Sequence, residues 1–213
     1  MGRQRRISSK VTEREKMISG MLYKTSDPEL VRLRDLARNA SIRYNQTTED
    51  QKDERRRILK ELLGSIGEGS EIYPNVHFDY GCNTYIGDNC FINFNCVFLD
   101  CAEIRIGNNV FIGPNVLLLT PIHLLLARER NIRVDEDGTR YMIEKAAPIT
   151  IEDNVWLGGG VTITPGVTIG HDSVIGAGSV VTKDIPSGVV AAGVPCRVIR
   201  EITEEDSLFK AFE

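Results

Sequence analysis

The sequence predicts a mainly β fold, a parallel β-helix of hexapeptide repeats that follows a small N-terminal α-helical domain. Three observations lead to this fold class. Apolar residues recur at every sixth position from Ile72 onward, whereas the preceding stretch has the spacing of amphipathic helices. No apolar run approaches the ~20 residues that are needed to cross a bilayer, so we expect no membrane-spanning segment.

The chain is expected to begin with a disordered tail over residues 1–11, and two helix starts follow it. Thr12 and Glu15 have the spacing of a capping box. Asp27 followed by Pro28 is an N-cap with proline at the first helical position. Apolar residues at helical spacing follow both starts, which predicts two amphipathic helices.

A third helix is expected to begin at Thr48 and to end before Gly64. It carries Ile58 and Leu62 on one apolar face, and the charged run at 53–57 is typical of a solvated helix face, with a binding patch as the alternative. Residues 12–66 are therefore assigned to the N-terminal helical domain.

The six-residue repeat occupies residues 67–202. Small or β-branched residues stand four places after most of its anchor positions. Three hexapeptides make one triangular coil, in which each anchor points inward and stacks on anchors of the coils about 4.8 Å away. The anchors are Ile72, Phe78, Ile86, Ile92, Phe98, Ile106, Ile112, Leu118, Ile151, Leu157, Ile163, Ile169, Ile175 and Val181.

Glycine and asparagine mark the expected corners of the coils. Examples are Gly87 with Asn89 and Gly107 with Asn109. Both residue types tolerate a positive φ, so we expect that conformation at these corners.

The overall composition narrows the class of protein. The chain has 26 basic and 30 acidic side chains and a net charge of -4, which argues against a nucleic-acid binder. Five cysteines without a CxxC pair are expected to be reduced thiols, and Cys90 and Cys96 fall on the small inward position of the repeat, where they would pack. No apolar segment follows the basic N-terminal residues, so we expect no secretory signal and a cytoplasmic location.

The repeat is interrupted over residues 120–147 and ends before a C-terminal tail at 203–213. The interruption has a charged middle and a turn at Asp137–Gly138. Loops of this length in a compact domain are usually functional. His123 stands at its start, which makes this histidine a candidate for catalysis.

A set of stretches, in this order along the chain, resembles the maltose and galactoside O-acetyltransferases. The similarity covers about residues 12–202. The stretches are Gly20 with Leu22–Tyr23, Ser26–Leu30, Asp79–Gly81, Phe91–Asn95, Ile112–Val116, Asp153–Trp156, Gly158–Gly160, Val181–Pro186 and Ala191–Arg200.

The resemblance implies a left-handed β-helix and an acyltransferase that uses acetyl-CoA and requires no metal. It also implies a homotrimer with active sites between neighbouring β-helices, and no nucleic-acid or membrane partner. The implied acceptor is a hydroxyl of a sugar such as maltose, glucose or a galactoside. An oligosaccharide of the nodulation-factor type or an antibiotic hydroxyl is the alternative acceptor.

The resemblance also implies residue roles. His123 and Asn93 would be catalytic, His123 as the base and Asn93 at the acyl site, where it would touch both coenzyme and acceptor. Asp79 would contact the acceptor sugar. The residues that the resemblance assigns to acetyl-CoA are Asn93, Trp156, Gly159, Ala177, Thr182, Lys183, Arg197 and Arg200.

These residue types suit acetyl transfer. A neutral imidazole can take a hydroxyl proton near pH 7, and a backbone N–H such as that of Gly159 can stabilise the thioester oxyanion. Basic side chains such as Lys183 and Arg197 can bind coenzyme phosphates.

The chain also departs from the family pattern, at positions that concern the acceptor. Leu124 replaces the proline that usually follows the catalytic histidine, and Ala146–Ala147 replace aromatic or Gly-Lys residues. Thr25 and Cys101 stand where galactoside-type members carry acceptor-binding acids. We therefore expect acetyl transfer to be kept and the acceptor to differ.

Two other classes of function fit the sequence less well. A β-helix carbonic anhydrase needs three histidines around zinc, two of them close in sequence, whereas His77, His123 and His171 are far apart. A non-catalytic scaffold would not need His123 together with the basic residues of a coenzyme site. Within acetyltransferases, serine is a less favoured acceptor because its enzymes resemble a different N-terminal domain.

Overall fold

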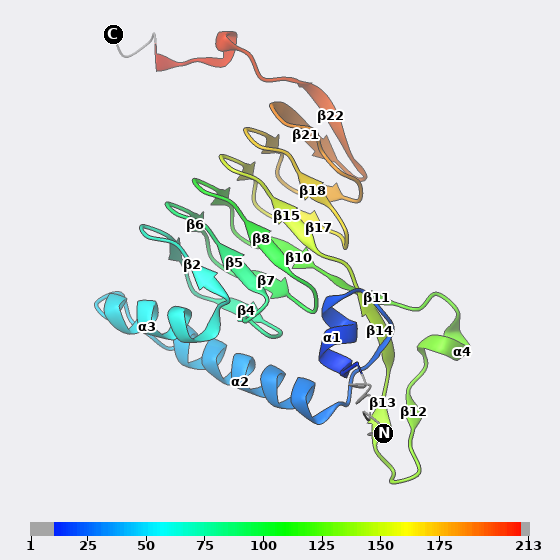
Figure 1. The fold of residues 1–213 in the computed structure, drawn as a ribbon. Coiled ribbons are helices and arrows are strands. Elements are labelled where there is room, and N and C mark those ends of the chain that lie inside the picture. Colours follow the sequence, from blue (N-terminus) through cyan, green and yellow to red (C-terminus); the bar gives the residue numbers. More distant parts are fainter. Residues whose placement is uncertain (1–10, 210–213) are drawn as a thin grey trace, which may run out of the picture.

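The computed structural model describes residues 11–209 as a three-sided, left-handed parallel β-helix with helices packed at its first coil (Figure 1). The fold class predicted from the repeat is confirmed. The expected tail at 1–11 lies outside the described residues except for Val11, and so does the end of the expected tail at 203–213. The boundaries of the domains stay a prediction.

Three helices form the N-terminal part: α1 (Glu13–Ile18), α2 (Pro28–Asn45) and α3 (Lys52–Leu62). The capping box of Thr12 and Glu15 is present, and Asp27 caps α2 with Pro28 at the first helical position, as predicted. The expected start of the third helix at Thr48 is wrong, because α3 begins at Lys52 after the N-cap Gln51.

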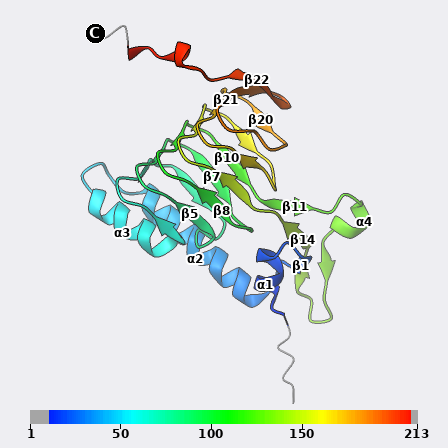
Figure 2. The ribbon, with the colours of Figure 1, turned by 45° about the horizontal axis from the view of Figure 1, so that its top comes forward.

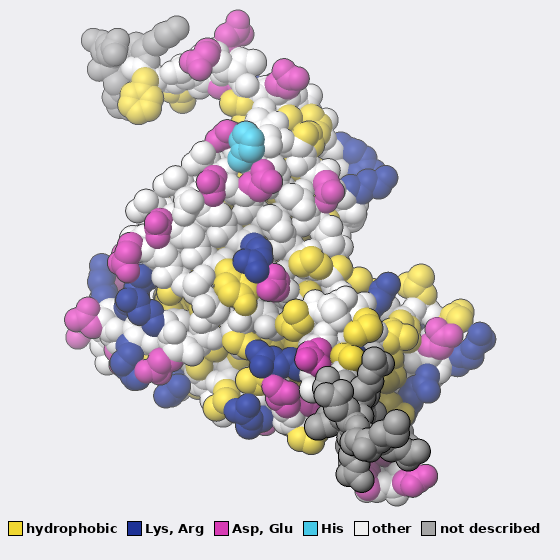
Figure 3. Space-filling view, in the orientation of Figure 1, with side chains coloured by type: hydrophobic (Ala, Val, Ile, Leu, Met, Phe, Trp, Pro, Cys, Tyr) yellow, Lys and Arg dark blue, Asp and Glu magenta, His cyan; other side chains and the backbone are white. Residues whose placement is uncertain are grey.

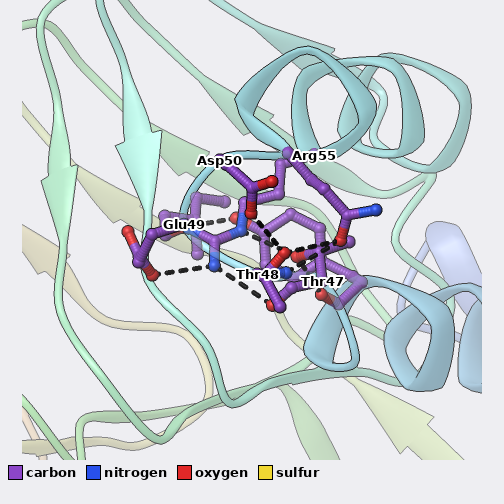
Figure 4. Close-up of polar contacts among 8 residues, drawn as sticks. Thr47, Thr48, Glu49, Asp50 and Arg55 are labelled. Carbon is purple, nitrogen blue, oxygen red and sulfur yellow. Dashed lines mark hydrogen bonds and ion pairs between the residues drawn. The ribbon is translucent and has the colours of Figure 1, made fainter.

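The segment before α3 is held by side-chain hydrogen bonds, which explains the later start (Figure 4). The Thr48 backbone N–H donates to Gln51 Oε1 at 2.9 Å, and the Thr48 hydroxyl donates to Asp50 at 2.6 Å. The buried Arg55 donates to Thr47 Oγ1 at 2.7 Å and to Glu49 at 2.9 Å. Threonine and aspartate side chains that bond locally favour a turn over a helix.

The solenoid has three parallel sheets. Sheet 1 contains β2 (Ser65–Ile66), β5 (Thr84–Ile86), β8 (Ile104–Ile106), β15 (Ile149–Ile151) and β18 (Thr168–Ile169). Sheet 2 contains β3 (Glu71–Ile72), β6 (Phe91–Ile92), β9 (Phe111–Ile112), β16 (Trp156–Leu157), β19 (Val174–Ile175), β21 (Val189–Gly193) and the antiparallel β22 (Cys196–Glu201). Sheet 3 contains β4 (Val76–Phe78), β7 (Cys96–Leu99), β10 (Leu117–Leu119), β17 (Thr162–Ile163) and β20 (Val180–Val181).

The anchors stack in register inside the prism. Ile92, Ile112 and Leu157 are Cα partners along sheet 2 and are at most 1% exposed. Cys90 and Cys96 are buried in the same core, where the repeat places them. Each coil therefore buries its apolar side chains against its two neighbours, which is the main source of stability in such an array.

The corners follow the expectation only in part. Asn89 and Asn109 have φ of 55° and 54°, as predicted for these corners. Gly87 and Gly107 serve another purpose, because a Cβ on Gly87 would lie 2.6 Å from the Gly107 carbonyl oxygen. These glycines are required by the close stacking of successive coils and not by a positive φ.

The interruption at 120–147 is an ordered excursion that leaves the prism after sheet 3 and returns to sheet 1 (Figures 1 and 2). It contains β11 (Pro121–His123), α4 (Ala127–Arg130), β12 (Arg133–Val134), β13 (Arg140–Tyr141) and β14 (Ile143–Ala146). Strands β11 and β14 form an antiparallel sheet with β1 (Tyr23–Lys24), so the N-terminal part and the excursion share one sheet. We name it the clamp sheet.

Candidate active site

His123 lies at the end of β11, in a row of three side chains that crosses the clamp sheet. It stands directly opposite Glu144 of β14, and Glu144 stands directly opposite Tyr23 of β1. Opposed residues of antiparallel strands place their side chains on one face of the sheet. The topology of the excursion thus brings together residues from the start and the middle of the chain.

The three side chains of this row are in contact. Nδ1 of His123 lies 3.3 Å from Oε1 of Glu144, within the range of an ion pair, and the Tyr23 hydroxyl donates to Oε2 at 3.0 Å. The carboxylate side chain is 10% exposed, whereas the imidazole is 52% exposed. Because a carboxylate can only accept, this contact favours the neutral tautomer with the proton on Nδ1, in which Nε2 is the acceptor.

Asp79, the predicted acceptor contact, lies beside this row. Its carboxylate pairs with Arg38 of α2 at 3.0 Å, and the Cys101 thiol donates to it at 3.9 Å. Burial and the charge of Asp79 raise the pKa of the Cys101 thiol, with Glu144 adding to the effect. Cys101 therefore fills the space between the Asp79 carboxylate and the histidine row.

Thr25, a departure from the galactoside-type pattern, has a structural use. Its hydroxyl accepts a hydrogen bond from the Met142 backbone N–H at 3.0 Å and donates to the Met142 carbonyl at 3.2 Å. Together with the pairing of β1 and β14, these bonds fasten the N-terminal part to the excursion.

Gly159 and Ala177 lie in one column along the edge where sheet 2 turns into sheet 3, and Asn93 lies at the same edge, one repeat position earlier. The column is tight, because a Cβ on Gly158 would lie 2.6 Å from the Ala177 nitrogen, and Gly178 donates to the Gly159 carbonyl at 2.9 Å. The Asn93 side chain accepts from the Phe94 backbone N–H at 2.8 Å. Among residues 11–209 the Gly159 N–H has no hydrogen-bond acceptor, so it is available to an added ligand.

Trp156 lies on the outer face of sheet 2, one strand position from this edge. It is 55% exposed and is the Cα partner of Phe111, which is 53% exposed. The two rings form an apolar surface that residues 11–209 leave exposed.

Thr182 and Lys183 lie at a different edge, where sheet 3 turns into sheet 1, and both are exposed. Arg197 is exposed on β22 and donates only to the neighbouring Cys196 carbonyl, at 2.7 Å. Basic side chains gather beside these last coils in the space-filling view (Figure 3). In the described part of the chain neither Lys183 nor Arg197 forms an ion pair, so both charges remain available.

Arg200, the third predicted coenzyme-binding cation, is already paired. Its guanidinium donates to both oxygens of Asp206, at 2.8 and 2.7 Å, and to the Glu201 carbonyl at 2.9 Å. Asp206 belongs to the short 3₁₀ helix η1 (Glu204–Asp206), which the Thr203 side chain caps. The hydrogen bonds from Arg200 lower the pKa of Asp206 to about 2.

The predicted residues thus form separate groups within one chain. His123 touches Glu144, which was not predicted, and within residues 11–209 it makes no hydrogen bond or ion pair with a predicted site residue. The other histidines are exposed: His77 lies on the outer face of β4, and His171 pairs with Asp172 at a corner, at 2.7 Å. In the described ranges no three histidine, cysteine or acidic residues are grouped as metal ligands, and no helix is long and apolar enough to cross a membrane.

Sequence reasoning missed Glu144 and Tyr23. A partial signal was present, since Glu144 is the acidic residue nearest to the end of the interruption, just before the repeat resumes at Ile149. Its pairing with Tyr23 joins residues 121 positions apart and could not be read from local spacing.

Two family models match the chain. Residues 16–67 match the maltose acetyltransferase hexapeptide capping motif, and residues 148–183 match six repeats of the bacterial transferase hexapeptide. The second range coincides with the longest unbroken part of the repeat.

Known proteins resemble nearly the whole chain. The galactoside O-acetyltransferase of Escherichia coli is 42% identical over 195 residues, which are 90% of this chain and 90% of that protein. The crystal structure of a maltose O-acetyltransferase from Clostridium difficile 630 is 48% identical, with a TM-score of 0.84 over 91% of this chain and 98% of that one. A hexapeptide-repeat acetyltransferase from Vibrio cholerae, solved with acetyl coenzyme A, is 37% identical, with a TM-score of 0.80 over 91% and 100%.

The fold, the repeat and these similarities agree with the resemblance found in the sequence, including its prediction of an acyltransferase. The chain belongs to the maltose and galactoside O-acetyltransferase family of hexapeptide-repeat acetyltransferases.

Proposed function

We propose that this acetyltransferase moves the acetyl group of acetyl-CoA to a hydroxyl of a sugar such as maltose, glucose or a galactoside. The observation that carries the proposal is the row of His123, Glu144 and Tyr23 at the excursion, in which the half-exposed imidazole faces the carboxylate through Nδ1. Names of relatives that act on galactosides or maltose support a sugar hydroxyl as the acceptor. An oligosaccharide of the nodulation-factor type or an antibiotic hydroxyl is the alternative.

The proposed reaction needs one base and one oxyanion donor. His123 Nε2 takes the proton of the acceptor hydroxyl as its oxygen attacks the thioester carbonyl carbon and a C–O bond forms. The unpaired N–H of Gly159 donates to the oxygen that becomes negative. When the intermediate collapses, the C–S bond breaks, and the coenzyme sulfur takes the proton from His123.

The remaining predicted residues fit supporting roles. Within residues 11–209 Lys183 and Arg197 form no ion pair, so their charges can bind the coenzyme phosphates, and the Thr182 hydroxyl can donate a further hydrogen bond to the coenzyme. Ala177 and Trp156 offer an open edge and an apolar face along which the coenzyme can lie. Asn93 is assigned to the acyl site and Asp79 to the acceptor, beside the histidine row.

We also propose a homotrimer, in which His123 of one chain meets the Gly159 edge of the next. Two apolar surfaces support association. Phe111 and Trp156 are more than half exposed on sheet 2, and on the excursion Leu125 is 93% and Val134 63% exposed. A cytoplasmic location is proposed as well, since all five cysteines are free thiols.

The test is His123→Ala, assayed by release of the coenzyme thiol from acetyl-CoA with a panel of sugars. We expect kcat to fall by about 10²–10⁴, with the affinity for acetyl-CoA nearly unchanged, because a base acts only in the chemical step. His171→Ala is the matched control, since within residues 11–209 the exposed side chain of His171 pairs only with the neighbouring Asp172. Near wild-type turnover of the His123 variant would contradict the proposed mechanism.

A further inference from the structure

The Tyr23 hydroxyl reaches the proposed active site from the N-terminal part of the chain. It donates to Oε2 of Glu144 at 3.0 Å, while the other carboxylate oxygen faces His123. Each carboxylate oxygen thus has one partner, and the two partners stand on opposite sides of Glu144 in the clamp sheet.

Tyr23 is itself held firmly. Its side chain is 1% exposed and belongs to a buried cluster with Met17, Leu30, Tyr80 and Cys101. Burial raises the pKa of Tyr23 far above its ordinary value, so the phenol remains a donor at any physiological pH. The aromatic ring cannot leave without disturbing the packing between α1, α2 and the first coils.

Neighbouring contacts fix the strand that carries Tyr23. Lys24 pairs with Asp135 of the excursion and lies 4.4 Å from the ring centroid of Tyr141. Thr25, the next residue, exchanges two hydrogen bonds with Met142. The two residues that follow Tyr23 therefore both fasten strand β1 to the excursion.

The carboxylate needs such a fixed partner because its other contact is loose. The distance of 3.3 Å between Nδ1 and Oε1 slightly exceeds the usual range of an N–H···O hydrogen bond, and the His123 ring is half exposed. Without the phenol, one buried oxygen of Glu144 would have no partner and the carboxyl group could rotate. The His123 ring would then lose its preferred orientation and tautomer.

We propose that Tyr23 is a positioning residue for acetyl transfer: through Glu144 it fixes the orientation and tautomer of His123, and it makes catalysis depend on the docking of the N-terminal helical domain. The inference rests on the proposed role of His123 as the base. It assigns the helical domain a catalytic function in addition to its packing against the first coil.

The experiment is Tyr23→Phe, which removes one oxygen and keeps the ring. We expect kcat to fall about tenfold, the worth of one hydrogen bond to a charged group, with the KM for acetyl-CoA changed less than twofold. The matched control is Tyr44→Phe, which removes another buried phenol that donates to the Ile72 carbonyl, away from the clamp sheet. The control is expected to keep the wild-type kcat.

A second readout follows His123 directly, by ¹⁵N NMR of the imidazole without any substrate. Wild type and Tyr44→Phe should show the tautomer protonated at Nδ1, and Tyr23→Phe should show a mixture. Should Tyr23→Phe not fold, 3,5-difluorotyrosine at position 23 keeps the shape, makes the phenol a stronger donor and should shift the same resonances.

The outcomes separate the two proposals. Unchanged kcat and unchanged His123 resonances in Tyr23→Phe would overturn the positioning role. An active His123→Ala enzyme would overturn the assignment of His123 as the base and, with it, the role of Tyr23 in catalysis. This holds even if the His123 resonances of Tyr23→Phe show that Tyr23, Glu144 and His123 are coupled.

Discussion

Replacing Glu144 by Gln is the most informative single change at the proposed site. The substitution keeps the size of the side chain and removes one acceptor. Tyr23 donates to Oε2, so the amide oxygen of the glutamine takes that place and its NH₂ group turns toward His123 Nδ1. Nδ1 must then accept, which moves the imidazole proton to Nε2, the atom that has to act as the base.

The structure sets the size of the effect. A hydrogen bond to a charged group contributes about 1.5–3 kcal/mol, which corresponds to a loss of about 10- to 150-fold in rate. A carboxylate-to-amide change beneath the catalytic histidine of a serine protease lowers kcat about 10⁴-fold. His123 is half exposed and can partly reorient toward water, so we expect an effect closer to the first estimate than to the second, a fall in kcat of about 10²-fold.

The assay is steady-state release of coenzyme thiol, with acceptor and acetyl-CoA varied separately. The KM for acetyl-CoA should stay within twofold, because the residues that we assign to the coenzyme lie on other edges of the prism. Glu152→Gln is the matched control, since Glu152 also accepts a hydrogen bond from a histidine, the His171 backbone N–H at 2.9 Å. A Glu144→Gln enzyme with wild-type kcat would refute the tautomer argument.

Two further predictions concern stability and coenzyme binding. Burial raises the pKa of Asp100 to about 6, against the opposing hydrogen bonds from Tyr80 and Thr84, so the folded state holds this proton more tightly than the unfolded state. The protonated carboxyl contributes about 3 kcal/mol to the free energy of unfolding below pH ~4, and this contribution is lost as the pH rises to ~6. The free energy of unfolding measured in urea should therefore fall between these pH values, and Asp100→Asn should remove that fall. An equal fall in the variant would contradict the assignment. Asp206→Asn should modestly lower the KM for acetyl-CoA with kcat unchanged, because loss of this exposed ion pair frees Arg200 for phosphate. A raised KM would show instead that Asp206 assists coenzyme binding.

The solenoid could be predicted because its signal is local. Ile112 and Leu118 stand six residues apart, and their burial follows from that period alone. The capping box of Thr12 and Glu15 is equally local and was found. The predicted start of α3 is wrong because Thr48, a residue type typical of helix N-caps, lies in a turn instead. There its backbone N–H donates to Gln51 and its hydroxyl donates to Asp50.

The candidate site could be predicted only in part, because it depends on pairing across the chain. His123 stands out by its place at the interruption, but its partners Glu144 and Tyr23 are defined by strand register in the clamp sheet. The pairing of Arg200 with Asp206 likewise could not be predicted from the repeat, because β22 runs antiparallel and ends the hexapeptide period.

The proposed site between chains predicts that two inactive variants can restore one another. In His123→Ala the base is lost, and in Ala177→Trp a bulky side chain covers the exposed edge assigned to the coenzyme. If each site takes His123 from one chain and the Ala177 edge from the next, every mixed trimer has one intact site. Random mixing of equal amounts then yields about one quarter of the wild-type activity by the symmetry of a closed trimer.

The measurement is acetyl transfer by the two variants, unfolded and refolded separately and as an equal mixture, with wild type treated in the same way. Each variant alone should be nearly inactive and should sediment as a trimer, and the mixture should recover about a quarter of the wild-type rate. A mixture no more active than its parents, beside fully active refolded wild type, would contradict a site that pairs His123 with the coenzyme edge of a neighbouring chain.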